Sequence, residues 1–173
     1  MTVQFDDAGW GDLLGGVVIS GYRVETGRLG HRVIDVRFFQ DPLFDRKDYL
    51  EEVSVAVQDM LLKTFEVSGN ESILICTGYV LSKAVRDLRE RGLNVSTGKI
   101  TGLLQEFGEK KYAETLKEIG YEALPDRESS VGMRRKSFYH MLNWMKIDLD
   151  HWKLAKTGWS LFHPEKRGER WSH

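Results

Sequence analysis

The sequence contains very little cysteine, no long apolar run and no targeting segment. Cys76 is the only cysteine among 173 residues, which excludes an internal disulfide and favours a reducing cytoplasm. The longest apolar runs span only a few residues, so no membrane-spanning helix is expected. Residues 1–4 show no basic segment followed by an apolar one, so no secretory signal is expected. We therefore expect a cytoplasmic protein without a membrane partner.

Several motifs of well-known enzyme classes are also missing. The five histidines show no zinc-ligand spacing with cysteine, and no Gly-x-Ser-x-Gly motif of a serine hydrolase occurs. Cys76 lies inside an apolar run, where a thiol is a poor nucleophile. The segment 96–101 fails as a P-loop, because Gly92 is one residue too far away and Ile100 replaces the required serine or threonine.

What the chain does contain is an ordinary globular composition with an uneven charge. It is 41% hydrophobic and 29% charged, with a net charge of −1. Residues 130–173 hold nine Lys/Arg against four Asp/Glu and also four of the five tryptophans, Trp171 among them. This division predicts a core over residues 1–124 and a basic, mainly helical extension over 125–173, joined by a linker at 125–130.

The basic extension has two interpretations. Basic residues among aromatic ones suit phosphate neutralisation and base stacking, which makes nucleic acid the expected partner. The candidate contacts are Arg134, Arg135, Lys136 and Trp144. Alternatively, the extension is a helical cap whose tryptophans pack on the core and whose charges face water.

Hydrophobic periodicity predicts alternating secondary structure after an opening β-meander. Strands are expected over 2–5, 13–24 and 32–39, with a turn at 25–30. Helical spacing predicts a helix over 46–65, and a continuous apolar run predicts a strand over 71–76. A helix over 79–91, a short strand over 93–95, a helix capped by Ser96 or Thr97, and a further helical segment over 109–119 complete the core. Helical spacing then continues around 138–145 and 148–156.

The order β-β-β-α-β-α-β-α and two short motifs resemble the ribonuclease H-like superfamily. In that family a catalytic aspartate closes the first strand, a glycine-containing turn follows, and a Gly-Gly pair starts the second strand. Asp7-Ala8-Gly9 and Gly15-Gly16-Val17-Val18-Ile19 are similar to this pattern. Asp-Ala-Gly is also similar to the Asp-Pro-Gly of Holliday-junction resolvases. The resemblance covers residues 3–119 and implies an α/β fold with three antiparallel strands, then parallel strands with helical crossovers.

The resemblance also implies site residues and a cofactor. Asp7 would be the principal ligand of Mg or Mn and a catalytic residue, with Asp6 beside it. A helix glutamate of the family would correspond to Glu51, and a last carboxylate to one of three glutamates on the final core helix, Glu106, Glu109 and Glu114. The family's fourth-strand aspartate is absent, because Gly78 occupies its place in Ile75-Cys76-Thr77-Gly78. Two-metal cleavage needs several carboxylates, so this loss counts against ordinary two-metal chemistry.

Two Thr-Gly pairs suggest phosphate binding independently of the resemblance. Thr77-Gly78 and Thr97-Gly98-Lys99 are each expected where a parallel strand runs into a helix. Such junctions offer free backbone N–H groups to an anion. The alternative is that these glycines merely permit tight turns.

Three functions are consistent with these observations. The first is a divalent-metal-dependent phosphodiesterase that acts on nucleic acid. The second is a non-catalytic member of the fold that binds nucleic acid or a protein, which Gly78 favours. The third is a small-molecule phosphate-binding protein that uses the Thr-Gly pairs. The sequence does not decide whether the chain forms a homo-oligomer.

Overall fold

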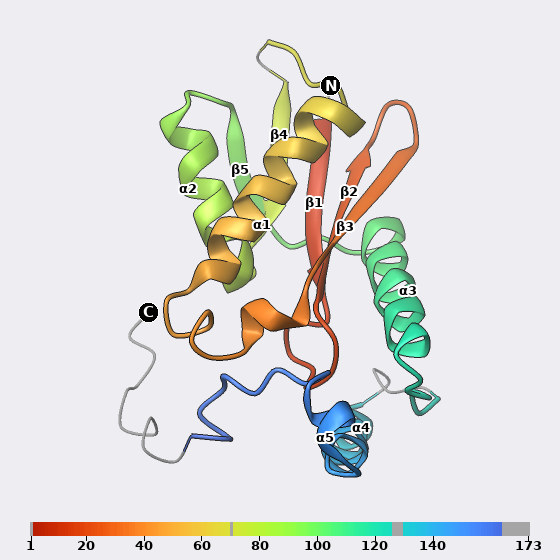
Figure 1. The fold of residues 1–173 in the computed structure, drawn as a ribbon. Helices are drawn as coiled ribbons and strands as arrows, with labels where there is room; N and C mark the ends of the chain where they lie inside the picture. Colours follow the sequence, from red (N-terminus) through yellow and green to blue (C-terminus); the bar gives the residue numbers. More distant parts are fainter. Residues whose placement is uncertain (1, 70, 126–129, 164–173) are drawn as a thin grey trace.

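One mixed β-sheet forms the centre of the molecule. The computed structural model describes residues 2–69, 71–125 and 130–163, so Trp171 and most of the predicted linker lie outside the described residues. The five strands follow the order β3-β2-β1-β4-β5 (Figure 1). Strands β1 (Thr2–Ala8), β2 (Val17–Arg23) and β3 (Arg28–Ile34) are antiparallel neighbours. Strands β4 (Ser72–Cys76) and β5 (Val95–Gly98) continue the sheet in parallel with β1.

This strand order confirms the predicted fold class. Three antiparallel strands lead into two parallel ones, as expected of a ribonuclease H-like mixed sheet, and helices make the crossovers. The helices are α1 (Asp48–Asp59), which continues into the π-helical turn η2 (Met60–Thr64), and α2 (Ser82–Glu90), which follows the 3₁₀ turn η3 (Tyr79–Leu81). Helix α3 (Leu103–Glu118) follows β5. Helices α4 (Val131–Met145) and α5 (Leu149–Trp152) come last.

The alternation of side chains along the strands separates two apolar cores. Phe5 of β1 and Ile19 of β2 belong to the core beneath α1 and α2. Ala8 and Val18 belong to a second core with α3 and α4. Because successive side chains of a strand point to opposite faces, the two cores lie on opposite faces of the sheet. We call the first the α1–α2 face and the second the α3–α4 face.

The C-terminal extension is joined to the core by backbone hydrogen bonds as well as by packing. Ala155 forms an isolated antiparallel bridge with Leu14, and the Lys156 N–H donates to the Leu13 carbonyl at 2.8 Å. The Gly158 N–H donates to the carbonyl of Phe39 at 3.0 Å. Figure 1 shows α4 and α5 beside the end of the sheet at which β1 turns into β2. The extension therefore positions the loop that follows Asp7.

The predicted third strand ends too late. β3 stops at Ile34, and Val36–Phe39 form the 3₁₀ turn η1. The Asp35 carboxylate accepts a hydrogen bond from the Arg37 N–H at 2.8 Å, which caps this turn. Such a local bond offers the backbone an alternative to the ladder, so the apolar alternation through Phe38 was misleading.

The end of the predicted core also differs in two ways. β5 extends to Gly98 and α3 begins only at Leu103, so the expected helix start at Ser96 or Thr97 is wrong. The expected interruption at Gly108 is also wrong, because α3 passes through it. A Cβ at Gly108 would lie 2.9 Å from Ser20 Oγ of β2. The glycine is thus a point of close helix–sheet approach rather than a break.

Among the residues that the structure describes, no helix combines the length and the apolar character that crossing a membrane requires.

Candidate functional site

Two carboxylates and one thiol meet where β1 and β4 end. The parallel pairing of Phe5 with Ile75 brings the ends of these strands side by side. One ligand atom from each of Asp6, Asp7 and Cys76 lies within 4.8 Å of the other two. The Asp7 N–H donates to Asp6 Oδ1 at 3.0 Å. Asp6 and Asp7 therefore share a site although they are adjacent on a strand. We call these three residues the acidic cluster.

Burial and like charge shift the protonation of the acidic cluster. The pKa of Asp7 rises from its ordinary 3.8 to about 7, mainly because burial disfavours the carboxylate, and then because Asp6 and Glu109 repel it. Burial also raises the pKa of Asp6, although hydrogen bonds from the Cys76 thiol and the Asp7 N–H oppose this shift. Burial and the hydrogen bond to Asp6 raise the pKa of Cys76 to about 11. The thiol is thus protonated. Asp7 is the group whose unfavourable negative charge a bound cation would offset most.

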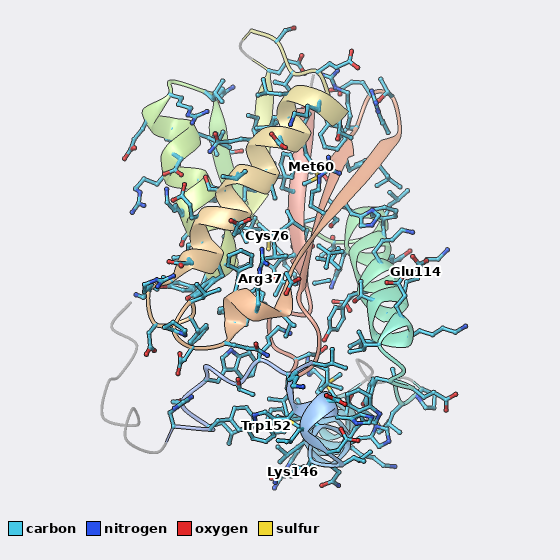
Figure 2. All side chains as sticks on the ribbon, viewed as in Figure 1. Arg37, Met60, Cys76, Glu114, Lys146 and Trp152 are labelled. Atoms are coloured by element: carbon cyan, nitrogen blue, oxygen red, sulfur yellow. The ribbon has the colours of Figure 1, made fainter. Side chains whose placement is uncertain are left out.

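Gly78 makes room for the Asp7 carboxylate. A Cβ at position 78 would clash with Asp7 Oδ1, because the two atoms would be closer than a van der Waals contact allows. The position at which the resemblance implies a further aspartate therefore does face Asp7, but without a side chain. Figure 2 labels Cys76 close to the middle of the sheet, two residues before this glycine. Gly78 therefore leaves space beside Asp7 at a position where the resemblance implies a carboxylate.

Asp7, alone of the acidic cluster, lines a pocket of about 560 Å³ between three parts of the chain. The loop after β1 contributes Asp7 to Asp12, and α3 contributes Glu109. Helix α4 supplies the remaining wall, namely Val131, Arg134, Arg135, Ser137 and Phe138. Its volume falls within the roughly 300–1,000 Å³ that is usual for ligand sites. Acidic residues therefore line one part of the pocket and basic residues another.

A buried lysine fixes the loop that borders this pocket. Lys156 is 0% exposed, and its Nζ donates to the carbonyls of Gly9 at 3.0 Å, Asp12 at 2.8 Å and Leu14 at 3.1 Å. Because three backbone carbonyls accept hydrogen bonds from one ammonium group, the loop is held in one conformation. The pocket wall from Gly9 to Asp12 is thus determined by a residue far along the chain.

The oxygen ligands of the acidic cluster fit one divalent ion. Mg²⁺ and Mn²⁺ prefer carboxylate and water oxygens, and an octahedral Mg²⁺ separates opposite ligands by about 4.2 Å. The ligand atoms of Asp6 and Asp7 lie no more than 4.8 Å apart, so both carboxylates can reach one ion. Two carboxylates and a protonated thiol are few ligands for a pair of ions, so the cluster fits a single ion better. Glu109, which lines the pocket with Asp7, is a further charge that acts on Asp7.

The other predicted carboxylates lie elsewhere. Glu51 of α1 is 63% exposed at its side chain and pairs with Lys83 of α2 at 3.0 Å, outside the acidic cluster. Glu106 is exposed on the first turn of α3. Glu114 pairs with Lys111 at 2.7 Å, and Figure 2 labels it on α3, away from Cys76. Of the three α3 glutamates that were predicted, Glu109 is the one that lines the pocket.

The two Thr-Gly pairs have different surroundings. Thr77-Gly78 does stand between β4 and a helical turn, as expected. Thr97-Gly98 lies inside β5, an edge strand in which Gly98 is paired with Cys76, and the exposed Lys99 follows it. Free helix-start N–H groups are therefore not present at Thr97, Gly98 or Lys99, which corrects the physical basis of that prediction. Their role as phosphate ligands stays a prediction.

Helix α4 sorts the predicted nucleic-acid contacts into two groups. Arg134 and Arg135 line the pocket, and the Arg135 guanidinium lies 5.8 Å from the ring centre of Tyr139. Lys136 is exposed and is not part of the lining. Trp144 is half-buried and packs edge-on against Tyr121, with the His151 ring 4.2 Å away. The packing interpretation thus describes Trp144 better than base stacking.

Sequence reasoning missed three residues of this region. Ser137 lines the pocket, and helical spacing next to the basic triplet could have placed it beside Arg134. The role of Lys156 had no sequence signal, since its partners are carbonyl groups of a distant loop. Cys76 was treated as a core residue, although its position at the end of β4 is that of a residue facing the site.

Comparisons with known proteins give little beyond this geometry. No family model matches the sequence, and no curated protein is similar to it. Among solved structures, the chain is similar to the catalytic core domain of BIV integrase, with a TM-score of 0.36 and 11% identity over 85% of this chain and 84% of that chain. So low a similarity shows no function for this chain.

Proposed function

We propose that this chain is a divalent-metal-dependent phosphodiesterase that acts on nucleic acid. One observation carries the proposal: ligand atoms of Asp6, Asp7 and Cys76 lie within 4.8 Å of one another, beside a pocket that Asp7 and Glu109 line. Burial, and then repulsion by Asp6 and Glu109, raise the pKa of Asp7 to about 7. Carboxylates that repel one another lower the stability of the folded state, and such groups cluster at functional sites. A bound cation would offset that repulsion.

The residues divide the work between a metal side and a phosphate side. Asp7 and Asp6 would bind a single Mg²⁺ or Mn²⁺ ion, and Glu109, which lines the pocket with Asp7, would add negative charge. When bound, the ion supplies Lewis-acid polarisation of a phosphate oxygen. Arg134 and Arg135 would neutralise the phosphate from the opposite wall. Negative charge on one side and positive charge on the other suit a phosphodiester bound through a cation.

The test combines metal binding with cleavage. Purified protein is incubated with labelled single-stranded, hybrid and branched nucleic acids in Mg²⁺ or Mn²⁺, and metal binding is measured by calorimetry. We expect Asp7→Asn and Glu109→Gln to lower cleavage by at least about tenfold. Glu114→Gln on the same helix is the matched control, because Glu114 pairs with Lys111 instead of lining the pocket. Full activity of Asp7→Asn, or no cleavage of any substrate by the unmodified chain, would contradict the proposal.

A second function is supported by Gly78. If the missing carboxylate at this position prevents cleavage, the chain is a non-catalytic nucleic-acid-binding member of the fold. This alternative predicts salt-sensitive binding without turnover, because phosphate contacts release counterions. It also predicts that Asp7→Asn leaves affinity unchanged, whereas a large loss of affinity in that variant would count against it.

A further inference from the structure

Helix α4 contributes a buried hydroxyl group without a partner to the pocket. Ser137 is 3% exposed, and its Oγ has no hydrogen-bond partner among the described residues. Buried polar side chains are almost always hydrogen-bonded, because leaving one unsatisfied costs about 1–3 kcal/mol. Ser137 lines the same pocket as Asp7. A hydroxyl without a protein partner, on a residue that lines a pocket, is available to bond to a ligand that binds there.

The surroundings of Ser137 favour an anion. Arg134 and Arg135 precede it by one helical turn or less, and both line the pocket. Val131, the first residue of α4, also lines the pocket, so the N-terminal end of this 15-residue helix borders it. The N-terminus of a helix carries partial positive charge and favours negatively charged ligands. Two guanidinium groups, a helix start and a hydroxyl donor are the groups that bind phosphate.

The acidic cluster limits where such an anion could bind. Asp7, Asp12 and Glu109 line the other side of the pocket and would repel a phosphate that approached them directly. The α4 wall is therefore the part of the pocket in which phosphate is favoured without a cation. A phosphate there would lie beside the metal site without replacing it.

We propose that Ser137, Arg134 and Arg135 form a phosphate subsite that holds a phosphate group of the substrate strand next to the acidic cluster. This inference rests on the proposed function for its substrate, but its binding chemistry does not require cleavage. The phosphate is either the terminal phosphate of a strand or an internal phosphodiester. Both have the same charged oxygens, and the experiment distinguishes them.

The experiment measures binding in the Asp7→Asn background with EDTA, so that neither metal nor cleavage contributes. Two short DNA strands of one sequence are compared by fluorescence anisotropy, one with a 5′-phosphate and one with a 5′-hydroxyl. We expect added Ser137→Ala or Arg134→Gln to weaken binding by about ten- to a hundredfold, as for loss of a hydrogen bond to a charged group. Added Lys136→Gln is the matched control, since Lys136 is adjacent on α4 but not part of the lining.

The outcomes separate the subsite from a structural role and from the nuclease proposal. A loss confined to the 5′-phosphorylated strand assigns the subsite to a terminal phosphate, and a loss with both strands assigns it to an internal one. Ser137→Ala should leave the melting temperature unchanged or raise it, because it removes an unsatisfied buried group. Affinity equal to that of the Lys136→Gln control in both arms would overturn the proposal. Retained phosphate binding together with failed cleavage would refute only the nuclease function.

Discussion

Helices cover both faces of the sheet, but the two faces bury different kinds of side chain. The α1–α2 face is largely apolar, and its two helices are joined by a hydrogen bond from the buried Ser54 Oγ to the Asp87 carboxylate at 2.6 Å and by the ion pair between Glu51 and Lys83. The α3–α4 face buries an ammonium group at Lys156, a tyrosine hydroxyl bonded to the Leu14 carbonyl, and the unsatisfied Ser137. The α1–α2 face thus buries few polar groups, while the α3–α4 face buries several of them beside the pocket.

Lys156→Met gives the sharpest test of this contrast. The change removes three charged hydrogen bonds and leaves buried carbonyls of the loop after β1 with fewer donors. We expect a loss of about 3–5 kcal/mol in the free energy of unfolding, measured by urea denaturation. Lys153→Met is the control, because Lys153 is 72% exposed at its side chain and its ion pair with Asp150 contributes little. Similar values for both variants would show that the buried lysine does not hold the loop.

Asp7→Asn should stabilise the protein, in a pH-dependent way. In the unfolded chain Asp7 ionises near its ordinary 3.8, but in the folded chain near 7, so stability without metal falls as the pH rises from about 4 to about 7. Removing the charge should have no effect at pH 4 and should add about 2–4 kcal/mol at pH 8. Thermal unfolding of both proteins in EDTA across this range measures the difference. A gain that is the same at pH 4 and pH 8 would contradict the electrostatic cause.

Gly78→Ala should weaken metal binding, and Gly98→Ala should not. A methyl group at position 78 displaces the Asp7 carboxylate, whereas at position 98 it would lie 3.3 Å from Leu74 Cδ1, which is a tight apolar contact away from the acidic cluster. We expect a loss of about tenfold in Mn²⁺ affinity for the first variant, equivalent to about 1.4 kcal/mol. Calorimetric titration of the pair checks this. Equal affinities would mean that Asp7 is not a ligand or that its carboxylate relocates freely.

Ile75→Val should have the smallest effect, and it probes the α1–α2 face. Ile75 is fully buried in the core beneath α1 and α2. Loss of one methylene from such a position costs about 0.5–1.5 kcal/mol, independently of pH and of divalent ions. Urea denaturation with and without Mn²⁺ measures both properties. A metal-dependent effect would show that the two faces are coupled more closely than their separate cores suggest.

The same contrast explains how much of the molecule the sequence predicts. The helix 46–65 and the strand 71–76 were placed nearly correctly, because an apolar face with a fixed period leaves a clear pattern. The end of β3 and the start of α3 were misplaced, because the Asp35 cap and the pairing of Gly98 with Cys76 are contacts that periodicity does not contain. Local patterns therefore gave the fold, but not the boundaries set by single hydrogen bonds.

The candidate site was predictable only in part, for a related reason. Asp6 and Asp7 stand out because carboxylates that end an apolar strand are unusual, and the structure does bring them together. The choice of Glu109 over Glu106 and Glu114 depends on how α3 is rotated about its axis against the sheet, which close approach at Gly108 helps to set. Lys156 shapes the site through hydrogen bonds to carbonyl groups more than a hundred residues away. Ser137 contributes a hydroxyl that has no partner among the described residues. Such relations exist only in three dimensions.

The position of Lys156 along the chain has a consequence for biosynthesis. Its ammonium group completes the curve of the loop from Gly9 to Leu14, which precedes it by 142 to 147 residues. A nascent chain that has not yet extended past this lysine carries both aspartates but lacks the residue that shapes the wall beside them. The ribosome must therefore add all the residues up to Lys156 before β1 acquires its finished surroundings.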